Sequence, residues 1–254
     1  TRTLATYSYE LNNKKAPFDN VNVRKALNLS LDRNVITDKV LGQGQTPTYV
    51  FTPTYIEEGQ LIQQPAYSKE PMAQRNEEAI KLLEEAGYSK ANPLKFSILY
   101  NTNENHKKVA IAAASMWKAN TKGLIDVKLE NQEWKTYIDS RRAGRYDAAR
   151  AGWNADYNQA TTFGNYFLSN SSNNTAKYAN PEYDKAIAES YVATDAEGRA
   201  KAYAKAEEIL AKDFGIVPIF NYVNPRLVKP YVKGYSGKDP QDHIYLRNLY
   251  IIKH

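Results

Sequence analysis

The strongest constraint on the fold is an alternation of short apolar strands and amphipathic helices over residues 94–153. Strand-like patterns lie between turn residues at 94–100, 125–129 and 146–153. Helix-like patterns with one apolar face cover 104–120 and 133–143. A β-α-β-α-β order favours parallel strand pairing, so the sequence predicts an α/β layer here.

The rest of the chain shows the same two patterns. Two further strands are predicted, at 4–9 and 216–223. Further helices are predicted at 21–31, 33–41, 72–86, 161–168, 182–192 and 195–213. The predicted helix caps are Asp32, Asn131, Asn180 before Pro181, and Thr194 paired with Glu197. Residues 45–71 predict a long surface connection or binding loop, and the tail contains apolar stretches at 226–232 and 245–252.

Composition excludes several classes of function. The net charge is +6, but the basic residues occur as separate doublets with acids nearby, so no nucleic-acid partner is predicted. The chain has no cysteine, which removes disulfides and thiol chemistry. No apolar run approaches the roughly 20 residues of a membrane span. The opening at Thr1, without a signal peptide or an initiator methionine, is interpreted as the start of a fragment.

No constellation for catalysis or metal binding is found. The three histidines are far apart and lack partners at ligand spacing, so neither a metal nor a cofactor is expected. Adjacent acids such as Glu77 and Glu78 lie on amphipathic helices and are interpreted as solvated charges. There is no nucleophile motif of the GxSxG kind. We therefore expect a protein without enzymatic activity.

The segment RYDAARAGWNADYN, residues 145–158, is the best candidate for a binding site. It begins as a strand, is expected to break at Gly152 beside Trp153, and places Asp156 in the following turn. An aromatic ring, flexible backbone and a carboxylate suit a ligand with a positive end. The alternative is that Asp156 is only a turn or helix-cap residue.

Three basic residues could bind the negative end of such a ligand. Arg141, Arg150 and His106 are candidates to receive an anion, because a guanidinium matches a carboxylate in shape. Together with Asp156, they fit a ligand that carries both an ammonium and a carboxylate, such as an amino acid or a peptide. The alternatives are that Arg150 pairs with an internal acid and that His106 faces only solvent.

Four segments then indicate a family: NQEWKTYIDSR, YDAARAGWNADYN, LSNSSNNTA and RLVKPYVKGYSGKDP…RNLYIIKH. They closely resemble periplasmic oligopeptide-binding proteins of ABC importers, a group that includes murein-peptide-binding proteins. The resemblance covers essentially all 254 residues, but only about the C-terminal half of such a protein. It implies a two-lobed clamp that closes on a peptide.

The resemblance also implies a domain organisation. This chain would contain a lobe of the type II periplasmic-binding-protein kind, with a mixed, partly parallel sheet flanked by helices. Residues 1–4 would end one hinge crossing, 5–223 would form the peptide-binding lobe, and 224–254 would return to the absent N-terminal lobe. The implied partners are short peptides and the membrane permease of the importer. The full-length protein would be a periplasmic monomer in a Gram-negative bacterium.

By the same resemblance, roles pass to individual residues. Asp156 would bind the peptide α-ammonium, and the backbone of Gly152 to Asn154 would pair with the peptide like an added strand. The residues implied to line side-chain pockets are Trp134, Trp153 and Tyr222. The residues implied to meet the peptide carboxylate or line its path are Arg141, Arg150 and His106.

This chain departs from the family pattern at three positions. Some relatives carry a cysteine pair where Ala5 and Asn154 stand here, and a carboxylate-binding lysine falls at Leu41, so preference for longer peptides is an open question. Two other readings stay open. One is a binder of another solute on the same scaffold, such as a murein peptide, a metal chelate or a haem-like ligand, and the other is a peptide hydrolase.

Overall fold

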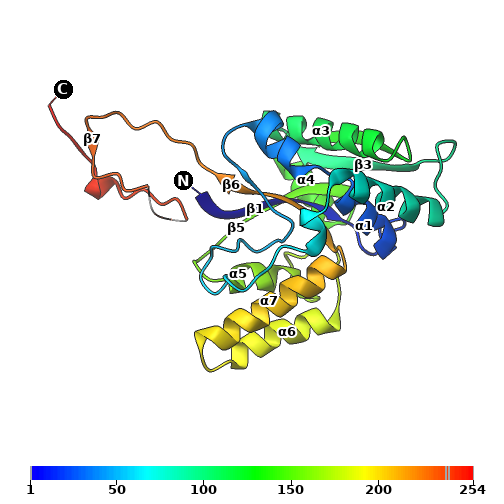
Figure 1. Cartoon of the computed structure of the whole chain (residues 1–254). Helices are drawn as coiled ribbons and strands as arrows, with labels where there is room; N and C mark the ends of the chain where they lie inside the picture. The colour runs from blue at the N-terminus through cyan, green and yellow to red at the C-terminus, as the bar shows by residue number, and fades with distance from the viewer. Residues whose placement is uncertain (1, 238, 240, 254) are drawn as a thin grey trace.

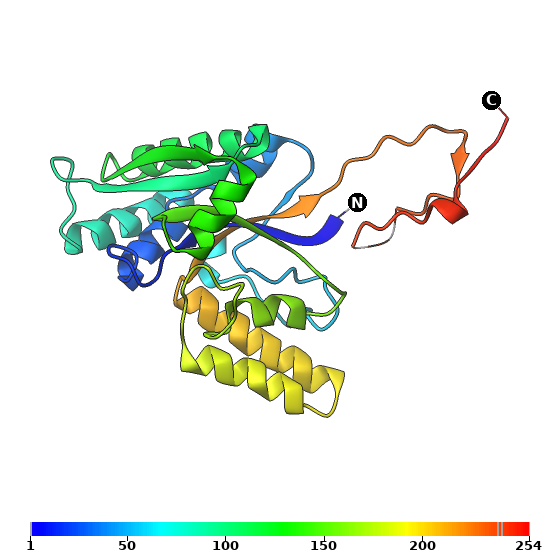
Figure 2. The same ribbon diagram turned by 180° about the vertical axis from the view of Figure 1, so that it is seen from behind.

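The computed structural model describes residues 2–237, 239 and 241–253. Its main sheet has six strands in the order β2-β6-β1-β5-β3-β4. These strands are β1 (Arg2–Leu11), β2 (Thr46–Pro47), β3 (Leu94–Asn101), β4 (Ile125–Gln132), β5 (Ala148–Asn154) and β6 (Ile216–Val223). A small second sheet pairs β7 (Val232–Lys233) with β8 (Tyr250–Ile251). Helices cover both faces of the main sheet (Figures 1 and 2).

The α-helices are α1 (Val21–Leu29), α2 (Met72–Glu85), α3 (Glu104–Asn120), α4 (Trp134–Arg142), α5 (Thr161–Gly164), α6 (Pro181–Val192) and α7 (Ala196–Lys212). The other helical segments are the π-helix η1 (Val35–Leu41) and the 3-10 helices η2 (Ala66–Lys69), η3 (Asn165–Phe167) and η4 (Leu246–Asn248). Every helix and strand predicted up to residue 223 has a counterpart at nearly the same position. The loop at 45–71 is mostly irregular, as predicted.

The sheet is mixed, because its two halves pair differently. β3 pairs in parallel with β4 and with β5, as the β-α-β-α-β order predicts. β1 pairs antiparallel with β5 and with β6, and β2 adds antiparallel to the far edge. The predicted fold class, a mixed and partly parallel sheet flanked by helices, is confirmed.

Each face of the sheet has its own apolar core. One core joins α1, α2 and α3 to the sheet and contains the fully buried Trp117, whose indole Nε1 donates to the Leu27 carbonyl at 2.9 Å. The other core joins α5, α6 and α7 to the opposite face and centres on Phe163 and Phe167. Burial on both faces explains why strands such as β6 read as continuous apolar runs.

Two predicted helix caps are wrong. Asn131 lies within β4, which is longer than predicted, and α4 starts after Glu133 without a side-chain cap. The cap of α7 is Asp195, whose side chain accepts a hydrogen bond from the Gly198 amide, rather than Thr194. Capping residues often stand next to each other in a sequence, and backbone conformation decides which one is used. The caps at Asp32 and Asn180 are confirmed by their hydrogen bonds to helical amides.

The predicted break of β5 at Gly152 is also wrong. The strand runs through this glycine to Asn154, because β1 pairs with it over the whole length, with Tyr7 opposite Gly152 and Ala5 opposite Asn154. Neighbouring strands can hold a glycine in extended conformation even though it lowers strand propensity.

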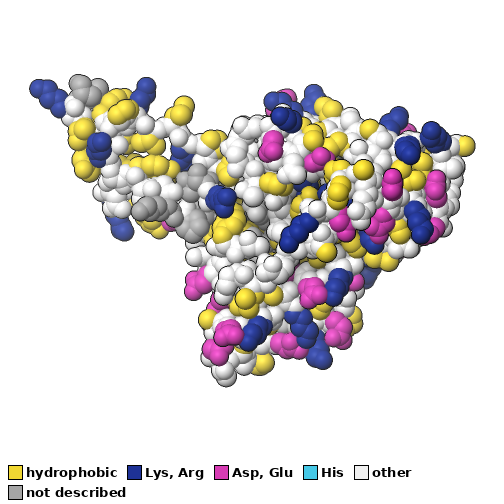
Figure 3. Space-filling view, viewed as in Figure 1, with side chains coloured by type: hydrophobic (Ala, Val, Ile, Leu, Met, Phe, Trp, Pro, Cys, Tyr) yellow, Lys and Arg dark blue, Asp and Glu magenta, His cyan; other side chains and the backbone are white. Residues whose placement is uncertain are grey.

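The tail after β6 extends away from the rest of the chain (Figure 1, orange to red). It carries large apolar side chains with high exposure, among them Leu227, Leu246 and Ile251. Figure 3 shows apolar side chains gathered on the tail, whereas basic and acidic side chains are interspersed over the body. In the described part of the chain, no helix has the length and apolar character needed to cross a membrane.

Candidate functional site

Alternation along β5 separates its side chains between the two faces of the sheet. Arg150, Gly152 and Asn154 share one face, on which Tyr7 of β1 also lies. Trp153 points to the opposite face, where its ring lies 5.0 Å from that of Tyr166. The end of β5 therefore presents polar groups on one side and anchors itself in a core on the other.

A cavity of about 610 Å³ opens at the end of the sheet where β1 begins and where β5 and β6 finish. This volume lies in the range of small-molecule binding sites. It is lined by Thr3, Leu4, His106, Trp134, Arg150, Gly152, Asn154, Ala155, Tyr222, Asn224, Gln241 and Asp242. Six of the nine residues predicted for the site line it, although they come from α3, α4, β5 and β6.

Among the described residues, Arg150 is a charged group in this cavity without a counter-ion. Its Nη2 donates to the Tyr222 hydroxyl at 2.6 Å, and its Cζ lies 5.2 Å from the centre of the Tyr7 ring. Within the described residues, its Nε has no hydrogen-bond partner, and no carboxylate forms an ion pair with its guanidinium. The alternative that Arg150 neutralises an internal acid is therefore not supported. Such a group favours an anion supplied from outside.

His106 lies in the first turn of α3, and its ring centre is 5.6 Å from that of Tyr7. Burial, and next the positive charge of Arg150, lower the pKa of His106 to about 3. The imidazole is thus neutral at ordinary pH. Its Nδ1 is buried and has no partner among the described residues. His106 is therefore a neutral hydrogen-bonding group beside Arg150, rather than a second cation.

Asp156 follows directly after the cavity wall. It is exposed, and its Oδ2 accepts a hydrogen bond from the Thr162 hydroxyl at 3.4 Å. Within the described residues no cation forms an ion pair with it, and it caps no helix. The Gln241 side-chain amide donates to the backbone carbonyl of Asp156 at 3.0 Å and leaves its carboxylate free of this contact. The carboxylate is therefore available to a ligand.

Two predicted site residues lie away from the cavity. Trp153 belongs to the core on the other face and donates from Nε1 to the Thr162 hydroxyl at 3.2 Å. Arg141 is almost buried and forms an ion pair with Glu10 at 2.9 Å. These contacts give both residues structural roles in this chain.

The sequence analysis missed several residues of the cavity wall. Thr3 is the second residue of β1, and its hydroxyl donates to the Tyr222 carbonyl at 3.1 Å. Gln241 and Asp242 reach the cavity because the tail folds back, and Asp242 is ion-paired with Arg226. No local pattern marks these residues, since only the three-dimensional path of the tail brings them to the wall.

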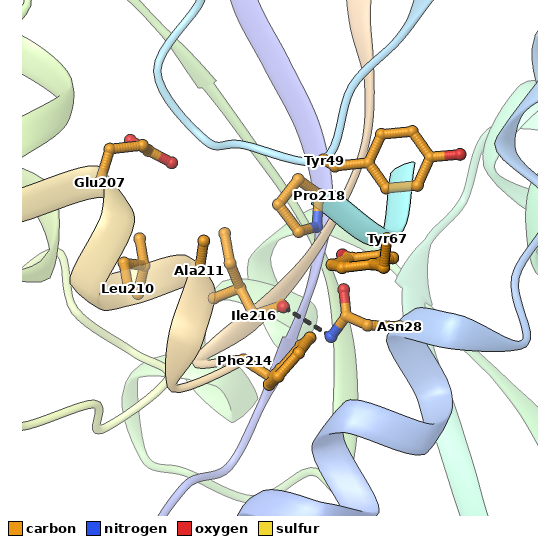
Figure 4. A pocket seen from close by; sticks show the side chains of 9 residues that line it. All are labelled: Asn28, Tyr49, Tyr67, Glu207, Leu210, Ala211, Phe214, Ile216 and Pro218. Carbon is orange, nitrogen blue, oxygen red and sulfur yellow. Dashed lines mark hydrogen bonds between the residues drawn. The ribbon is translucent and has the colours of Figure 1, made fainter. Parts of the chain in front are cut away.

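Two other hollows are poorer candidates. Figure 4 shows the side chains that line one of them, between α1, α7 and β6. Its volume of about 10 Å³ is enough for a single water. A groove of about 920 Å³ between α1, η2 and α7 is larger than the cavity. Its lysines, however, already have glutamate partners in the pairs Lys25–Glu78, Lys201–Glu197, Lys205–Glu189 and Lys212–Glu208.

The final feature of the site is an edge of β5 with which no other described strand pairs. The pairing of β5 with β3 ends at Ala149, whereas its pairing with β1 continues to Asn154. The Ala155 amide donates to the Leu4 carbonyl, so by alternation the peptide groups of Gly152 and Asn154 point away from β1. We call this side of residues 152–154 the open edge. An extended chain could add to it as a further strand.

Comparison with known proteins agrees with this geometry. Residues 1–175 match the family model described as bacterial extracellular solute-binding proteins, family 5 Middle. The chain is 97% identical over its whole length to the periplasmic oligopeptide-binding protein OppA of Haemophilus influenzae, and 44% identical over 251 residues to the murein peptide-binding protein MppA of Escherichia coli. It spans about half the length of these relatives, 47% and 46%.

Solved structures give the same result. The crystal structure of H. influenzae OppA in complex with RPPGFSPFR superposes with a TM-score of 0.94 at 96% identity, covering all of this chain and 49% of that one. The structure of E. coli MppA superposes with a TM-score of 0.91 at 44% identity, over all of this chain and 49% of that one. The sheet, the cavity at its end and the family match lead to one conclusion: this chain belongs to family 5 of the bacterial extracellular solute-binding proteins.

Proposed function

We propose that the full-length protein, of which this chain is about half, binds short oligopeptides as the solute-binding component of an ABC importer. The observation that carries the proposal is the open edge of β5 between Asp156 and the uncompensated Arg150. An extended ligand with one ammonium and one carboxylate matches this arrangement. The names of the relatives, oligopeptide-binding and murein peptide-binding proteins, support the same ligand class.

Each part of the ligand has a proposed partner. Asp156 binds the α-ammonium, and the peptide groups of Gly152 and Asn154 bind the main chain. Arg150 receives the carboxylate, with the neutral His106 as a hydrogen-bonding neighbour. Trp134, which is 57% exposed at the cavity, offers an aromatic surface to a ligand side chain. Main-chain and terminal contacts make affinity largely independent of peptide sequence.

The proposed domain organisation follows from the exposed tail. Residues 5–223 form the binding lobe, whereas residues 1–4 and 224–254 connect it to the other lobe. Thr1, Lys238, Pro240 and His254 lie outside the described residues. Apolar side chains of the tail such as Leu246, 76% exposed, would become covered by that second lobe. Closure of the two lobes would remove the open edge and Asp156 from solvent.

The proposed setting is the periplasm, where OppA relatives are named as residing, and the proposed partner is the importer's membrane permease. The relatives are solute-binding proteins, and we propose that the full-length protein likewise lacks catalytic activity. Peptide binding of this kind needs neither a cofactor nor chemistry on the ligand.

The test is to purify the full-length protein without denaturation and to identify the ligands carried with it by mass spectrometry. Short peptides in the wild type, strongly depleted in Asp156→Asn, are expected. A haem-like group, a metal chelate or a bile-acid-like solute in their place would contradict the proposal. Incubation with a defined tripeptide, followed by recovery of intact peptide, excludes hydrolysis, whereas recovery of its fragments would establish it.

A further inference from the structure

Gly152 lies two residues after Arg150 on the same face of β5. The Arg150 guanidinium lies against the side of Gly152 on which a side chain would project. A Cβ atom added to Gly152 would lie 2.9 Å from the Tyr222 hydroxyl and 3.0 Å from Nη2 of Arg150. Real Cβ atoms essentially never make contacts under 3.0 Å. The hydrogen-bonded pair of Arg150 and Tyr222 thus occupies the space that a side chain at position 152 would need.

Backbone conformation does not require glycine at this position. Gly152 is absent from the glycines with positive φ, and it sits in regular antiparallel register with Tyr7. An alanine could therefore adopt the same extended backbone. The space that the glycine leaves open, rather than its conformational freedom, explains its position beside the cavity.

In the part of the chain that the structure describes, the partners of the guanidinium are all neutral. Nη2 donates to Tyr222 at 2.6 Å, and Nη1 lies 3.5 Å from the Asn101 side-chain oxygen. These groups orient the cation without neutralising it. Tyr222 comes from β6, on the far side of β1, so it can approach Nη2 only if nothing projects from Gly152 between them.

We propose that Gly152 and Tyr222 are specificity-determining positions that fix the place of the Arg150 guanidinium and thereby select peptide length. Gly152 supplies the space, and Tyr222 is a positioning residue that holds Nη2 in it. The peptide length whose carboxylate reaches this fixed cation is the preferred one. This inference rests on the proposed function, since it assumes a peptide carboxylate at Arg150.

The experiment is calorimetry on the full-length protein with peptides of two to five residues, each as free acid and as C-terminal amide. In Gly152→Ala, the free acid of the preferred length is expected to bind about tenfold more weakly or worse, because a charge-assisted hydrogen bond is displaced. Its amide should lose less affinity than the free acid does, because the added methyl points toward Arg150 and not toward the open edge.

A double-mutant cycle with Tyr222→Phe tests the mechanism. Removing the hydroxyl clears the 2.9 Å contact, so Gly152→Ala/Tyr222→Phe should bind the free acid within about twofold of Tyr222→Phe alone. Gly198→Ala is the matched control. It adds a methyl 3.1 Å from Asp195 in the first turn of α7, outside the cavity wall, and should leave acid and amide binding unchanged.

The outcomes separate the two proposals. If Arg150→Gln weakens acids and amides equally, no carboxylate binds at Arg150 and the proposed role of that residue fails. If Arg150→Gln affects acids alone while Gly152→Ala affects neither, or both equally, only the inference about Gly152 is overturned. Independent, multiplying losses in Gly152→Ala and Tyr222→Phe would also overturn it.

Discussion

The carboxylate of Glu10 lies 2.9 Å from the guanidinium of Arg141, and the Glu10 side chain is fully buried. Tyr166 donates to the same carboxylate at 2.7 Å, and the Thr175 hydroxyl donates to its other oxygen. Arg150, nine residues later, has only neutral partners among the residues that the structure describes. Two arginines that look equivalent in the sequence thus have opposite roles, one neutralised inside the lobe and one left for a ligand.

Replacing Arg141 by glutamine should destabilise the protein by about 3–5 kcal/mol, because Glu10 would be left as an unpaired buried charge. Urea unfolding of the full-length protein measures the loss. The neighbouring Arg142 is exposed and forms no ion pair within the described residues, so Arg142→Gln should change stability by less than about 0.5 kcal/mol. Equal losses in both variants would show that the buried pair contributes nothing.

Removing the cap of α7 gives a second stability test. Asp195→Ala deletes the side-chain oxygen that accepts the Gly198 amide at 2.7 Å and should cost about 1 kcal/mol. Thr194→Ala changes the neighbour that the capping-box pattern favoured and should cost only a few tenths. Thermal unfolding of the two variants compares them directly. A larger effect at Thr194 than at Asp195 would contradict the cap assignment.

Local sequence patterns predict some features of this fold and not others. The elements of the β-α-β-α-β segment were predicted within a few residues, because apolar periodicity is a local property of the chain. The choice between Thr194 and Asp195 as the cap of α7 could not be predicted, because it depends on one residue's backbone conformation. The continuation of β5 through Gly152 depends on β1, which is more than 140 residues away in the sequence.

The candidate site divides in the same way. Arg150, Gly152 and Asn154 could be predicted together, since they alternate on one strand. Arg141 and Trp153 have the right chemistry, but their positions depend on contacts with Glu10 and Tyr166, and no local pattern predicts these contacts. The wall residues Gln241 and Asp242 depend on the path of the tail. Residue type indicates the chemistry of a site, whereas tertiary contacts decide which residues reach it.

The buried imidazole of His106 predicts a pH dependence of stability. Its pKa is about 3 in the folded chain and about 6.5 when unfolded, so between these values the unfolded state binds more protons. The contribution of His106 is therefore fully present above pH about 6.5 and is lost as the pH falls toward 3. Between pH 7 and 4 the wild type should lose roughly 1–2 kcal/mol more than His106→Gln, a figure reduced for partial solvent exposure.

Urea unfolding at several pH values measures this difference, and both proteins share every other titrating group. Parallel stability profiles for the wild type and His106→Gln would mean that the imidazole is solvated and can be protonated in the folded protein. Peptide affinity, by contrast, should not change between pH 6 and 8 on account of His106, because the ring stays neutral throughout.

The open edge predicts that this chain by itself is a weak binder. A peptide on β5 would contact one lobe and stay exposed to solvent on its other side. It should therefore bind this chain at least roughly a hundredfold more weakly than it binds the full-length protein. Calorimetry with the same tripeptide on both proteins measures the ratio. Equal affinities would contradict the proposed clamp, because the second lobe would then add no contacts.

Asp156 provides the sharpest test of the site. Its carboxylate is exposed here and has no ion-pair partner among the described residues, but in the closed full-length protein it would face the ligand's ammonium away from water. Asp156→Asn should then cost about 2–5 kcal/mol of peptide affinity, since a buried ammonium would lose its counter-charge. N-acetylated peptides, which lack this charge, should bind the wild type and the variant with nearly equal affinity.

The nearby Asp242 is already paired with Arg226, so Asp242→Asn should not distinguish free from acetylated peptides. If Asp156→Asn weakens both peptides alike, the carboxylate does not bind the amino terminus, and the proposed orientation of the ligand is wrong.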